Sequence, residues 1–291
     1  MRNFLDELTY NEILISDGAW GTMLQPKLDK AGGCPEGLNL TNPEAVKEVA
    51  VSYVEAGANM IETNSFGGTR FKLMNYDLGD KVNDINVAAA KISKEAAGDK
   101  AYVLGSVGPT GKILMMGEVS EDEIYDAFKE QVVGLAEGGA DAIIVETMTD
   151  LAEASIAVRA AKENTKLPVI CTMTFDKLKD GTYRTMMGVS PAEMVEALIP
   201  LGVDVTGANC GNGAENMVDI VKEIRAVHSG IPVLVHANAG MPVLQDGATV
   251  FPETPAQMAT FIKPLKDAGV NIIGGCCGTT PDHIRELVKS K

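Results

Sequence analysis

EGGADAIIVETM, at residues 137–148, joins the end of a predicted helix to a predicted strand and carries the pattern that decides the fold. Its glycines suit the left-handed conformation that ends a helix, and an Asp then opens a run of apolar residues. Similar junctions occur as EAGANMIE, PLGVDVTGAN and DAGVNIIGGC, at 55–62, 200–209 and 267–276. A junction that recurs regularly along a chain predicts a repeated structural unit.

Eight segments are predicted to form strands, and helical patterns separate them. Strands that alternate with helices are typical of a parallel sheet whose strands are joined by crossover helices. Eight such units favour a closed (β/α)8 TIM barrel of the α/β class over an open sheet. No Pro- or Ser-rich linker divides the chain, so a single domain, 1–291, is expected. The predicted strands are 13–18, 59–66, 101–108, 141–148, 167–175, 203–210, 231–238 and 271–278.

The composition limits the partners and the location. A net charge of −15 would repel nucleic acid and anionic membrane surfaces, so neither is an expected partner. The N-terminus has no basic start followed by an apolar run, and no segment has the apolar length that spans a bilayer, so a cytoplasmic protein is expected. Five cysteines, two of them adjacent, are not the pattern of a disulfide framework.

Three cysteines end two of the predicted strands. Cys210 ends the sixth strand in GANCGNG, and Cys276 and Cys277 end the eighth in IIGGCCGT. The carboxyl ends of barrel strands share one rim, and the loops after them build the active site. Adjacent strand residues face opposite sides, so both neighbouring sulfurs reach one ion only if the surrounding glycines bend the backbone. Three thiolates that leave one tetrahedral position open are typical of a catalytic zinc site.

A zinc ion held by three thiolates is a poor Lewis acid for water but suits sulfur, so an incoming thiol is the expected fourth ligand. Coordination deprotonates the thiol at neutral pH and keeps it nucleophilic. The predicted chemistry is therefore attack of a thiolate on an activated carbon, most simply a methyl group. Cys34 and Cys171, taken singly, are interpreted as ordinary buried cysteines.

These motifs resemble the homocysteine S-methyltransferases, and in particular the homocysteine-binding domain of cobalamin-dependent methionine synthase. The resemblance covers essentially the whole chain. It implies that the rim binds zinc through Cys210, Cys276 and Cys277 and that the thiol is homocysteine, which becomes methionine. The motifs that carry it are DGAWGT (17–22), ETNSFGG (62–68), GSVGPTG (105–111), ETM (146–148), GANCG (207–211), ANAGMP (237–242) and GGCCGTTP (274–281).

Polar residues at other strand ends are candidates for binding the amino acid. The resemblance implies that Asp17 and Glu146 hold the ammonium group, although a capping role suits Asp17 equally well. Glu146 follows an apolar run closely, so its charge needs a partner. The glycine-rich segments around Ser65, Phe66 and Ser106 offer backbone N–H groups to the substrate carboxylate.

Three further features belong to the same rim. The resemblance implies that Asn238, at the end of the seventh strand, approaches zinc through its carboxamide oxygen when no thiol is bound. His236, within that strand, is interpreted as a satisfied core residue rather than a ligand. The stretch 21–43, after the first strand, is much longer than an ordinary βα loop and is a candidate active-site loop.

The methyl donor is predicted from composition and from the resemblance. A quaternary ammonium donor usually needs an aromatic cage, and the chain is 5% aromatic with Trp20 as its one tryptophan, so betaine is disfavoured. The chain has no room for folate or cobalamin modules, so the expected donor is methylcobalamin or another methylated corrinoid on a separate protein that docks over the rim. S-methylmethionine is the alternative donor, and selenocysteine or another small thiol the alternative acceptor.

Methionines in the predicted loops are a candidate docking surface for such a partner, but scattered gap filling is favoured for them. They include the pairs 115–116 and 186–187. Two other classes of function remain open: a barrel hydrolase or lyase in which Asp17 and Glu146 act as acid and base, and a zinc-binding scaffold without a substrate.

Overall fold

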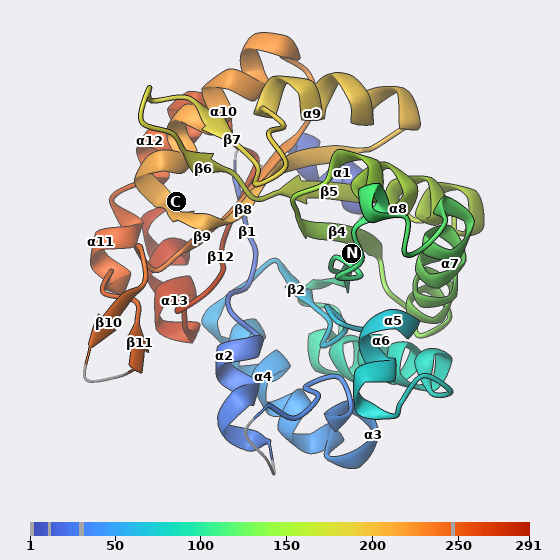
Figure 1. Cartoon of the computed structure of the whole chain (residues 1–291). Helices are drawn as coiled ribbons and strands as arrows, with labels where there is room; N and C mark the ends of the chain where they lie inside the picture. Colours follow the sequence, from blue (N-terminus) through green and yellow to red (C-terminus); the bar gives the residue numbers. More distant parts are fainter. Residues whose placement is uncertain (1–2, 11–12, 29–31, 246–247) are drawn as a thin grey trace.

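Eight parallel strands form the central sheet of the protein. The computed structural model describes residues 3–10, 13–28, 32–245 and 248–291. Neighbouring strands follow the order β1-β12-β9-β8-β5-β4-β3-β2, and helices surround them (Figure 1). Every predicted strand is present, and the predicted TIM barrel is confirmed. The strands are β1 (Leu14–Ile15), β2 (Met60–Glu62), β3 (Tyr102–Val107), β4 (Ala142–Met148), β5 (Val169–Met173), β8 (Val205–Gly213), β9 (Val233–Asn238) and β12 (Ile272–Gly275).

The seam of the barrel lies where β1 meets β2. The N–H of Asn59 donates to the carbonyl of Ile15 at 2.7 Å, and Asn59 Oδ1 accepts the Ile15 N–H at 2.9 Å. Further along, the carboxylate of Asp17 accepts the N–H of Glu62 at 2.8 Å. Side-chain oxygens therefore take the place of strand carbonyls at this seam and join the two ends of the sheet.

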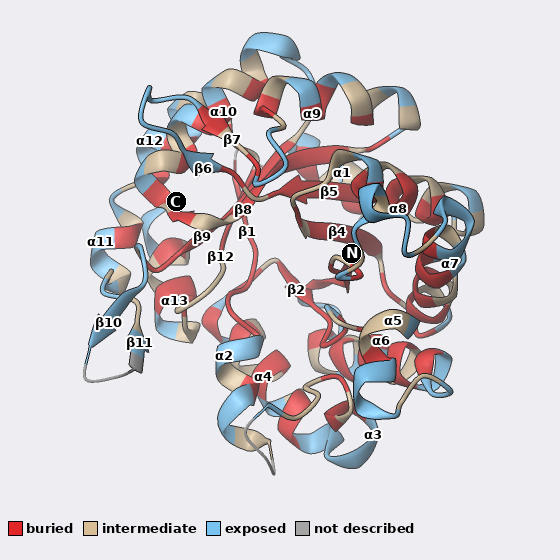
Figure 2. Cartoon of the chain, viewed as in Figure 1, coloured by how far each residue is buried: buried red, intermediate tan, exposed pale blue. Residues whose placement is uncertain are grey.

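Helices cover the outside of the barrel and bury their apolar faces against it, as Figure 2 shows by the contrast between buried strands and exposed outer helix faces. Some of them begin with local caps, such as the capping boxes that Ser120 and Ser190 form at α7 and α9. The main helices are α4 (Pro43–Ala56), α6 (Val82–Ala97), α7 (Glu121–Glu137), α8 (Leu151–Asn164), α9 (Pro191–Leu198), α10 (Ala214–Val227), α12 (Ile262–Ala268) and α13 (Pro281–Ser290).

The inside of the barrel is an apolar cluster to which the barrel strands contribute. The helix α1 (Phe4–Tyr10), which was not predicted, packs Phe4 and Leu8 onto this cluster, with the rings of Phe4 and Tyr102 edge to face at 5.6 Å. Residues two apart on a strand face the same side of the sheet. On each strand, the residue two positions after a residue of this cluster therefore also points inward, near the carboxyl end of the strand. The cluster includes Leu14, Met60, Leu104, Ala142, Ile144, Ile170, Val205, Leu234 and Ile272.

The loops at the carboxyl ends carry small elements that the sequence did not reveal. Two hairpins, β6–β7 (Asp176–Lys177 with Tyr183–Arg184) and β10–β11 (Val243–Gln245 with Ala248–Val250), follow β5 and β9. The second projects from the body of the barrel (Figure 1). The predicted long loop, 21–43, holds short helices, while its residues 29–31 lie outside the described residues. The short helices of the chain are α2 (Gly21–Leu24), η1 (Gln25–Lys27), α3 (Leu38–Thr41), α5 (Arg70–Leu73), η2 (Met74–Tyr76), η3 (Leu114–Met116), η4 (Ile199–Leu201) and α11 (Pro255–Ala259).

Within the described part of the chain, no helix combines the length and the apolar character needed to cross a membrane.

Candidate active site

Three cysteine sulfurs meet at the carboxyl-terminal rim. The Sγ atoms of Cys210, Cys276 and Cys277 all lie within 4.8 Å of one another, and those of Cys210 and Cys277 are 3.8 Å apart. All three residues are partly buried. The structure thus brings together the three residues that the sequence singled out as metal ligands.

The backbone leaves strand geometry at Cys210. Its φ is 58°, in the left-handed region that favours glycine, and Gly211 follows with a φ of 67°. The pairing of β8 with β9 shifts register between Asn209 and Gly213, so this segment bulges out of the ladder. The bulge turns the Cys210 sulfur toward the other two.

The adjacent cysteines lie in a turn after β12 rather than in the strand. The N–H of Thr279 donates to the carbonyl of Cys276 at 3.1 Å, and Gly278 has a φ of 80°. Gly278 therefore plays the part predicted for it. Gly274 differs, because it matters for close packing: a Cβ there would lie 2.7 Å from the ring of His236.

Negative charge in the sulfur cluster gathers on Cys210. Hydrogen bonds from the thiols of Cys276 and Cys277 lower the pKa of Cys210 to about 3, although burial opposes this. The same contact with Cys210 raises the pKa of Cys277 to about 11 and that of Cys276 well above its usual value. A cluster that shares protons in this way has the soft, anionic character that a thiophilic cation needs.

The other two cysteines lie outside this cluster. Burial raises the pKa of the Cys34 thiol to about 12, helped by Glu36, to which the thiol donates at 3.3 Å. Burial alone raises the pKa of Cys171, which is fully buried on β5. Both side chains behave as inert thiols.

Two asparagines flank the cysteines. Asn238 hydrogen-bonds the Cys210 sulfur, and its buried Oδ1 has no hydrogen-bond partner among the described residues. Asn209, which the sequence reasoning missed, accepts the N–H of Thr147 at 2.8 Å and returns a hydrogen bond to the Thr147 hydroxyl at 2.7 Å. Thr147 has a φ of 60°, so Asn209 holds a strained residue next to Glu146.

Glu146 points into the mouth of the barrel. The Ser106 hydroxyl donates to its Oε1 at 2.5 Å, and the Asn209 amide is 3.5 Å from its Oε2. Burial raises the pKa of Glu146 well above its usual range, and the nearby Glu62 raises it further. No lysine or arginine of the described chain forms an ion pair with it, so the partner that its charge needs is not supplied from within these residues.

The carboxylate of Asp17 accepts hydrogen bonds from neighbouring groups of the protein. The Trp20 indole N–H donates to Oδ2 at 2.7 Å, the Glu62 N–H donates to the same oxygen at 2.8 Å, and the Ser16 hydroxyl is 3.2 Å from Oδ1. Burial raises its pKa while these hydrogen bonds lower it. Asp17 therefore joins β1 to β2 as well as standing beside the site.

Glu62 and His236 are inward-facing residues that the sequence reasoning did not assign to the site. Both are buried, and Nδ1 of His236 lies 3.3 Å from Oε1 of Glu62. Neither that oxygen nor Nε2 of His236 has a hydrogen-bond partner among the described residues, so the interpretation of His236 as a satisfied core residue is wrong. The available signal was their position two residues after Met60 and Leu234, which face the barrel interior.

The residues predicted to receive a carboxylate are differently engaged. The Ser65 N–H donates to the Thr63 carbonyl at 2.9 Å, and the Ser106 N–H donates to the Thr63 hydroxyl at 3.0 Å. The Ser65 hydroxyl donates to the Ser106 carbonyl at 2.7 Å. The Phe66 N–H has no partner within the described chain, and its side chain is partly exposed. Phe66 is therefore the one of these three residues with a free backbone donor.

Exposed apolar side chains stand on the loops around the mouth. Met115 is 84% exposed and Met116 67% in the loop after β3, while Met186 is 77% exposed after β5 and Leu244 80% exposed after β9. Such exposure rules out gap filling, so that interpretation of the loop methionines is wrong here. The βα loops share one face of a barrel, and these side chains therefore surround the cysteine site.

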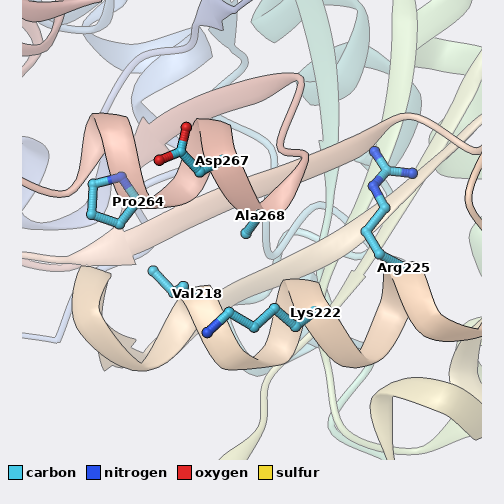
Figure 3. Close-up of a pocket in the computed structure, with 6 residues that line it drawn as sticks. All are labelled: Val218, Lys222, Arg225, Pro264, Asp267 and Ala268. Atoms are coloured by element: carbon cyan, nitrogen blue, oxygen red, sulfur yellow. The ribbon is translucent and has the colours of Figure 1, made fainter.

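One surface pocket lies away from the cysteine site. The pocket in Figure 3 lies between α10 and α12 on the outer helical layer, and none of its lining residues belongs to the site. Its lining consists of Val218, Lys222, Arg225, Pro264, Asp267 and Ala268.

Comparison with known proteins gives concordant matches. A family model described as homocysteine S-methyltransferase matches residues 14–290. Methionine synthase of Mycobacterium leprae (strain TN) is 35% identical over 299 residues, which are 97% of this chain and 24% of that protein. Methionine synthase of Mycobacterium tuberculosis (strain ATCC 25618 / H37Rv) is 35% identical over 303 residues, 98% of this chain and 25% of that protein. The chain thus spans about a quarter of the length of these relatives.

Solved structures of the homocysteine methyltransferase MmuM from Escherichia coli have the same fold. The metallated form matches with a TM-score of 0.83 at 22% identity, covering 100% of both chains. The apo form matches with a TM-score of 0.74 at 23% identity, covering 100% of this chain and 99% of the other.

Proposed function

Because this chain belongs to the homocysteine S-methyltransferase family, we propose that it transfers a methyl group to the sulfur of homocysteine and so forms methionine, with a zinc ion at the rim. The observation that carries the proposal is the meeting of three cysteine sulfurs within 4.8 Å at the carboxyl ends of β8 and β12. The position of these sulfurs on the face where barrel enzymes build their active sites supports a catalytic role.

The three cysteines fit zinc in both chemistry and spacing. Sulfur ligands about 2.3 Å from a tetrahedral zinc ion stand about 3.8 Å apart, which agrees with the 3.8 Å between the sulfurs of Cys210 and Cys277. When bound, zinc would offer an incoming thiol a fourth position at which the thiol loses its proton. Asn238, against the Cys210 sulfur, is the neutral group proposed to stand near that position.

The rest of the mouth suits the amino-acid part of homocysteine. We propose that Glu146, oriented by Ser106 and Asn209, attracts the ammonium group together with Asp17. The substrate carboxylate would be received on the opposite side by the free N–H of Phe66, with Ser65 and Ser106 holding that loop in place. The site would then fix both charged groups of the substrate and leave its sulfur at the cysteines.

The proposed donor is the methyl group of a methylated corrinoid such as methylcobalamin, carried by a separate protein. The exposed apolar side chains around the mouth support this choice, because a small donor would need no surface of this kind outside the cavity. Betaine is less well suited: Trp20 is 8% exposed and its indole is bonded to Asp17, so it is not available as the wall of an aromatic cage.

The barrel hydrolase or lyase has less support than methyl transfer. Such an enzyme would need Asp17 as a free acid or base, but one oxygen of Asp17 already accepts two N–H groups. A scaffold without a substrate would have no use for the free donor at Phe66 and the unpaired acceptors at the mouth.

The proposed function is tested by supplying zinc-loaded protein and homocysteine with a panel of donors and measuring methionine. Methylcobalamin, free and on a corrinoid protein, is compared with S-methylmethionine and betaine. Selenocysteine and simple alkyl thiols replace homocysteine in parallel reactions. Methionine formed from methylcobalamin supports the proposal, and absence of methylated product with every donor contradicts it.

A further inference from the structure

A buried glutamine on α7 lies behind the loop that follows β2. Gln131 is fully buried and shares the buried face of its helix with Phe128, Val132 and Leu135. A carboxamide in such a position costs free energy unless both of its ends find hydrogen-bond partners. The Oε1 atom of Gln131 has no partner among the described residues. The stability of the fold therefore does not by itself account for a glutamine at this position.

The amide group of Gln131 holds two strand ends together. Its Nε2 donates to the Ser65 carbonyl at 2.6 Å and to the Ser106 carbonyl at 3.3 Å. Each carbonyl also has a second donor, because the Gly68 N–H donates to Ser65 at 2.8 Å and the Ser65 hydroxyl donates to Ser106 at 2.7 Å. Neither carbonyl would be left unsatisfied without Gln131. What the glutamine adds is a fixed direction for the peptide units that it contacts.

This direction matters most for the peptide unit between Ser65 and Phe66. The bond is trans, so the Ser65 carbonyl and the Phe66 N–H point in opposite directions across one plane. The helix α7 belongs to the outer helical layer (Figure 1). Because Gln131 holds the carbonyl toward α7, the Phe66 N–H is turned away from that layer, toward the inner side of the loop.

Neighbouring groups occupy the rest of this loop. The Phe66 carbonyl accepts the Gly108 N–H at 2.9 Å, and a Cβ at Gly108 would lie 2.5 Å from the Phe66 ring. The Gly67 N–H donates to the Glu36 carboxylate at 2.6 Å. The Phe66 N–H is left free, and a hydrogen bond donated to the carbonyl of the same peptide unit makes that N–H a stronger donor.

We propose that Gln131 is a positioning residue for recognition of the substrate carboxylate, and that it acts through the peptide unit whose N–H belongs to Phe66. This deepens the proposed function and rests on it, because that function places the carboxylate at this N–H. An incoming carboxylate also meets Glu62 and Glu146 in the barrel mouth, and like charges repel at short range. Its binding therefore depends on a well-directed donor. Gln131 would thereby favour thiols that carry a carboxylate.

The test compares two thiols that differ only in the carboxylate. Homocysteine and 3-aminopropane-1-thiol are titrated calorimetrically into zinc-loaded wild type and Gln131→Met. Methionine has a similar length but no N–H donor. The variant is expected to weaken homocysteine binding at least about fivefold, because the contact with the charged carboxylate is misdirected. The aminothiol should change less than about twofold, since the Ser65 hydroxyl still holds the Ser106 carbonyl. Zinc content should equal that of wild type.

Asn86 on α6 provides a matched control. It is fully buried, it donates to the Gly68 carbonyl at 2.9 Å, and its Oδ1 also has no partner among the described residues. It thus holds the same loop but a different peptide unit. Asn86→Leu should change the binding of both thiols equally and by less than about twofold. If Gln131→Met does not fold, Gln131→Leu removes the donor with a side chain that suits a helix, and the loss should again be confined to homocysteine.

Three results would overturn the proposal. They are an equal loss for both thiols in Gln131→Met, unchanged homocysteine binding in that variant, or the same selective loss in Asn86→Leu. Failure of the proposed function is distinguishable because it is seen in the wild type, as binding of neither thiol or as equal affinity for both. Either of those wild-type results would overturn this inference as well.

Discussion

Asp17 accepts the backbone N–H of Glu62 at 2.8 Å and so joins the first and second strands of the barrel through a side chain. Beyond Ile15 the β1 backbone no longer pairs with β2, and the carboxylate takes over. The indole of Trp20 donates to the same oxygen at 2.7 Å. This one buried oxygen of Asp17 thus binds both the end of β2, at Glu62, and the start of the loop after β1, at Trp20.

Replacing this oxygen should destabilise the barrel. Asp17→Ala leaves the Glu62 N–H and the Trp20 indole without an acceptor, and we expect a loss of about 2–4 kcal/mol in the free energy of unfolding. Asp17→Asn keeps an acceptor oxygen and should lose less than about 1 kcal/mol. Urea unfolding of both variants gives the comparison. Equal stability of wild type and Asp17→Ala would show that the seam does not depend on this contact.

Each of the three cysteines in the cluster is expected to be necessary for the protein to retain zinc. Replacing Cys210, Cys276 or Cys277 with Ala removes one of three ligands, and each variant is expected to lose zinc and activity. Cys34→Ala and Cys171→Ala are the controls, since both thiols lie outside the cluster. Zinc per chain is measured by atomic emission after dialysis, and about one equivalent is expected for wild type and controls. A Cys276→Ala, Cys277→Ala double variant that keeps its zinc would exclude this site.

Asn209 is expected to matter for both stability and metal binding. Its carboxamide holds Thr147 in a left-handed conformation, and Asn209 itself immediately precedes Cys210 in the chain. Asn209→Ala should lower the free energy of unfolding by about 2–4 kcal/mol, because the Thr147 N–H loses its acceptor in a partly buried setting and the buried Thr172 hydroxyl loses its acceptor as well. Weaker zinc binding should accompany this loss. Asn164→Ala, at the end of α8, is the control; if it costs as much as Asn209→Ala, the strained segment has no special role.

The buried carboxylate of Glu146 gives a pH-dependent prediction for the metal-free protein. Its pKa is raised on folding, so its contribution to stability is complete below the unfolded pKa near 4.5 and is lost as the pH rises through the folded pKa. Glu146→Gln cannot lose a proton. It should therefore match wild type near pH 5 and become the more stable protein as the pH approaches 7.5.

Urea unfolding at several pH values measures this difference. His236 has the opposite linkage, because burial lowers its pKa on folding. Glu146 partly opposes that lowering, so the difference between the two proteins also includes the interaction of Glu146 with His236. The exposed Glu55→Gln variant on α4 serves as the control. A difference between wild type and Glu146→Gln that is constant from pH 5 to 7.5 would contradict a burial-raised pKa.

Much of the barrel and its sulfur cluster could be predicted because both follow from local patterns. Apolar runs after junctions with a Gly two residues before an Asn or Asp predicted strands. The rule that strand ends share one rim brought Cys210 and Cys276 together across the 65 residues between them. The short helix α1 was missed because its burial depends on Tyr102, far along the chain.

Glu62 and His236 were missed for a different physical reason. Their inward direction depends on strand register, and a shift of one residue would turn both side chains to the outside. The structural role of Asp17 depends on where β1 stops pairing, which the local sequence does not encode. The outward methionines were misassigned because composition alone cannot separate a buried Met from one that is 84% exposed.

The rim methionines give the last prediction, which concerns how the methyl donor arrives. Met115 and Met186 stand on different βα loops around the mouth and are among the most exposed apolar side chains described. A corrinoid protein that docks there would bury both, so Met115→Gln with Met186→Gln should lower kcat/KM for the protein-bound methyl donor at least about tenfold. Free methylcobalamin makes no such contact, and its slow reaction with homocysteine should change less than about twofold. Val227→Gln, an exposed apolar site at the end of α10, is the control and should leave both rates unchanged. Equal losses with free and protein-bound methylcobalamin would mean that the methionines shape the cavity and do not form a docking surface. Efficient turnover with S-methylmethionine or betaine, but none with methylcobalamin, would reject the corrinoid donor itself.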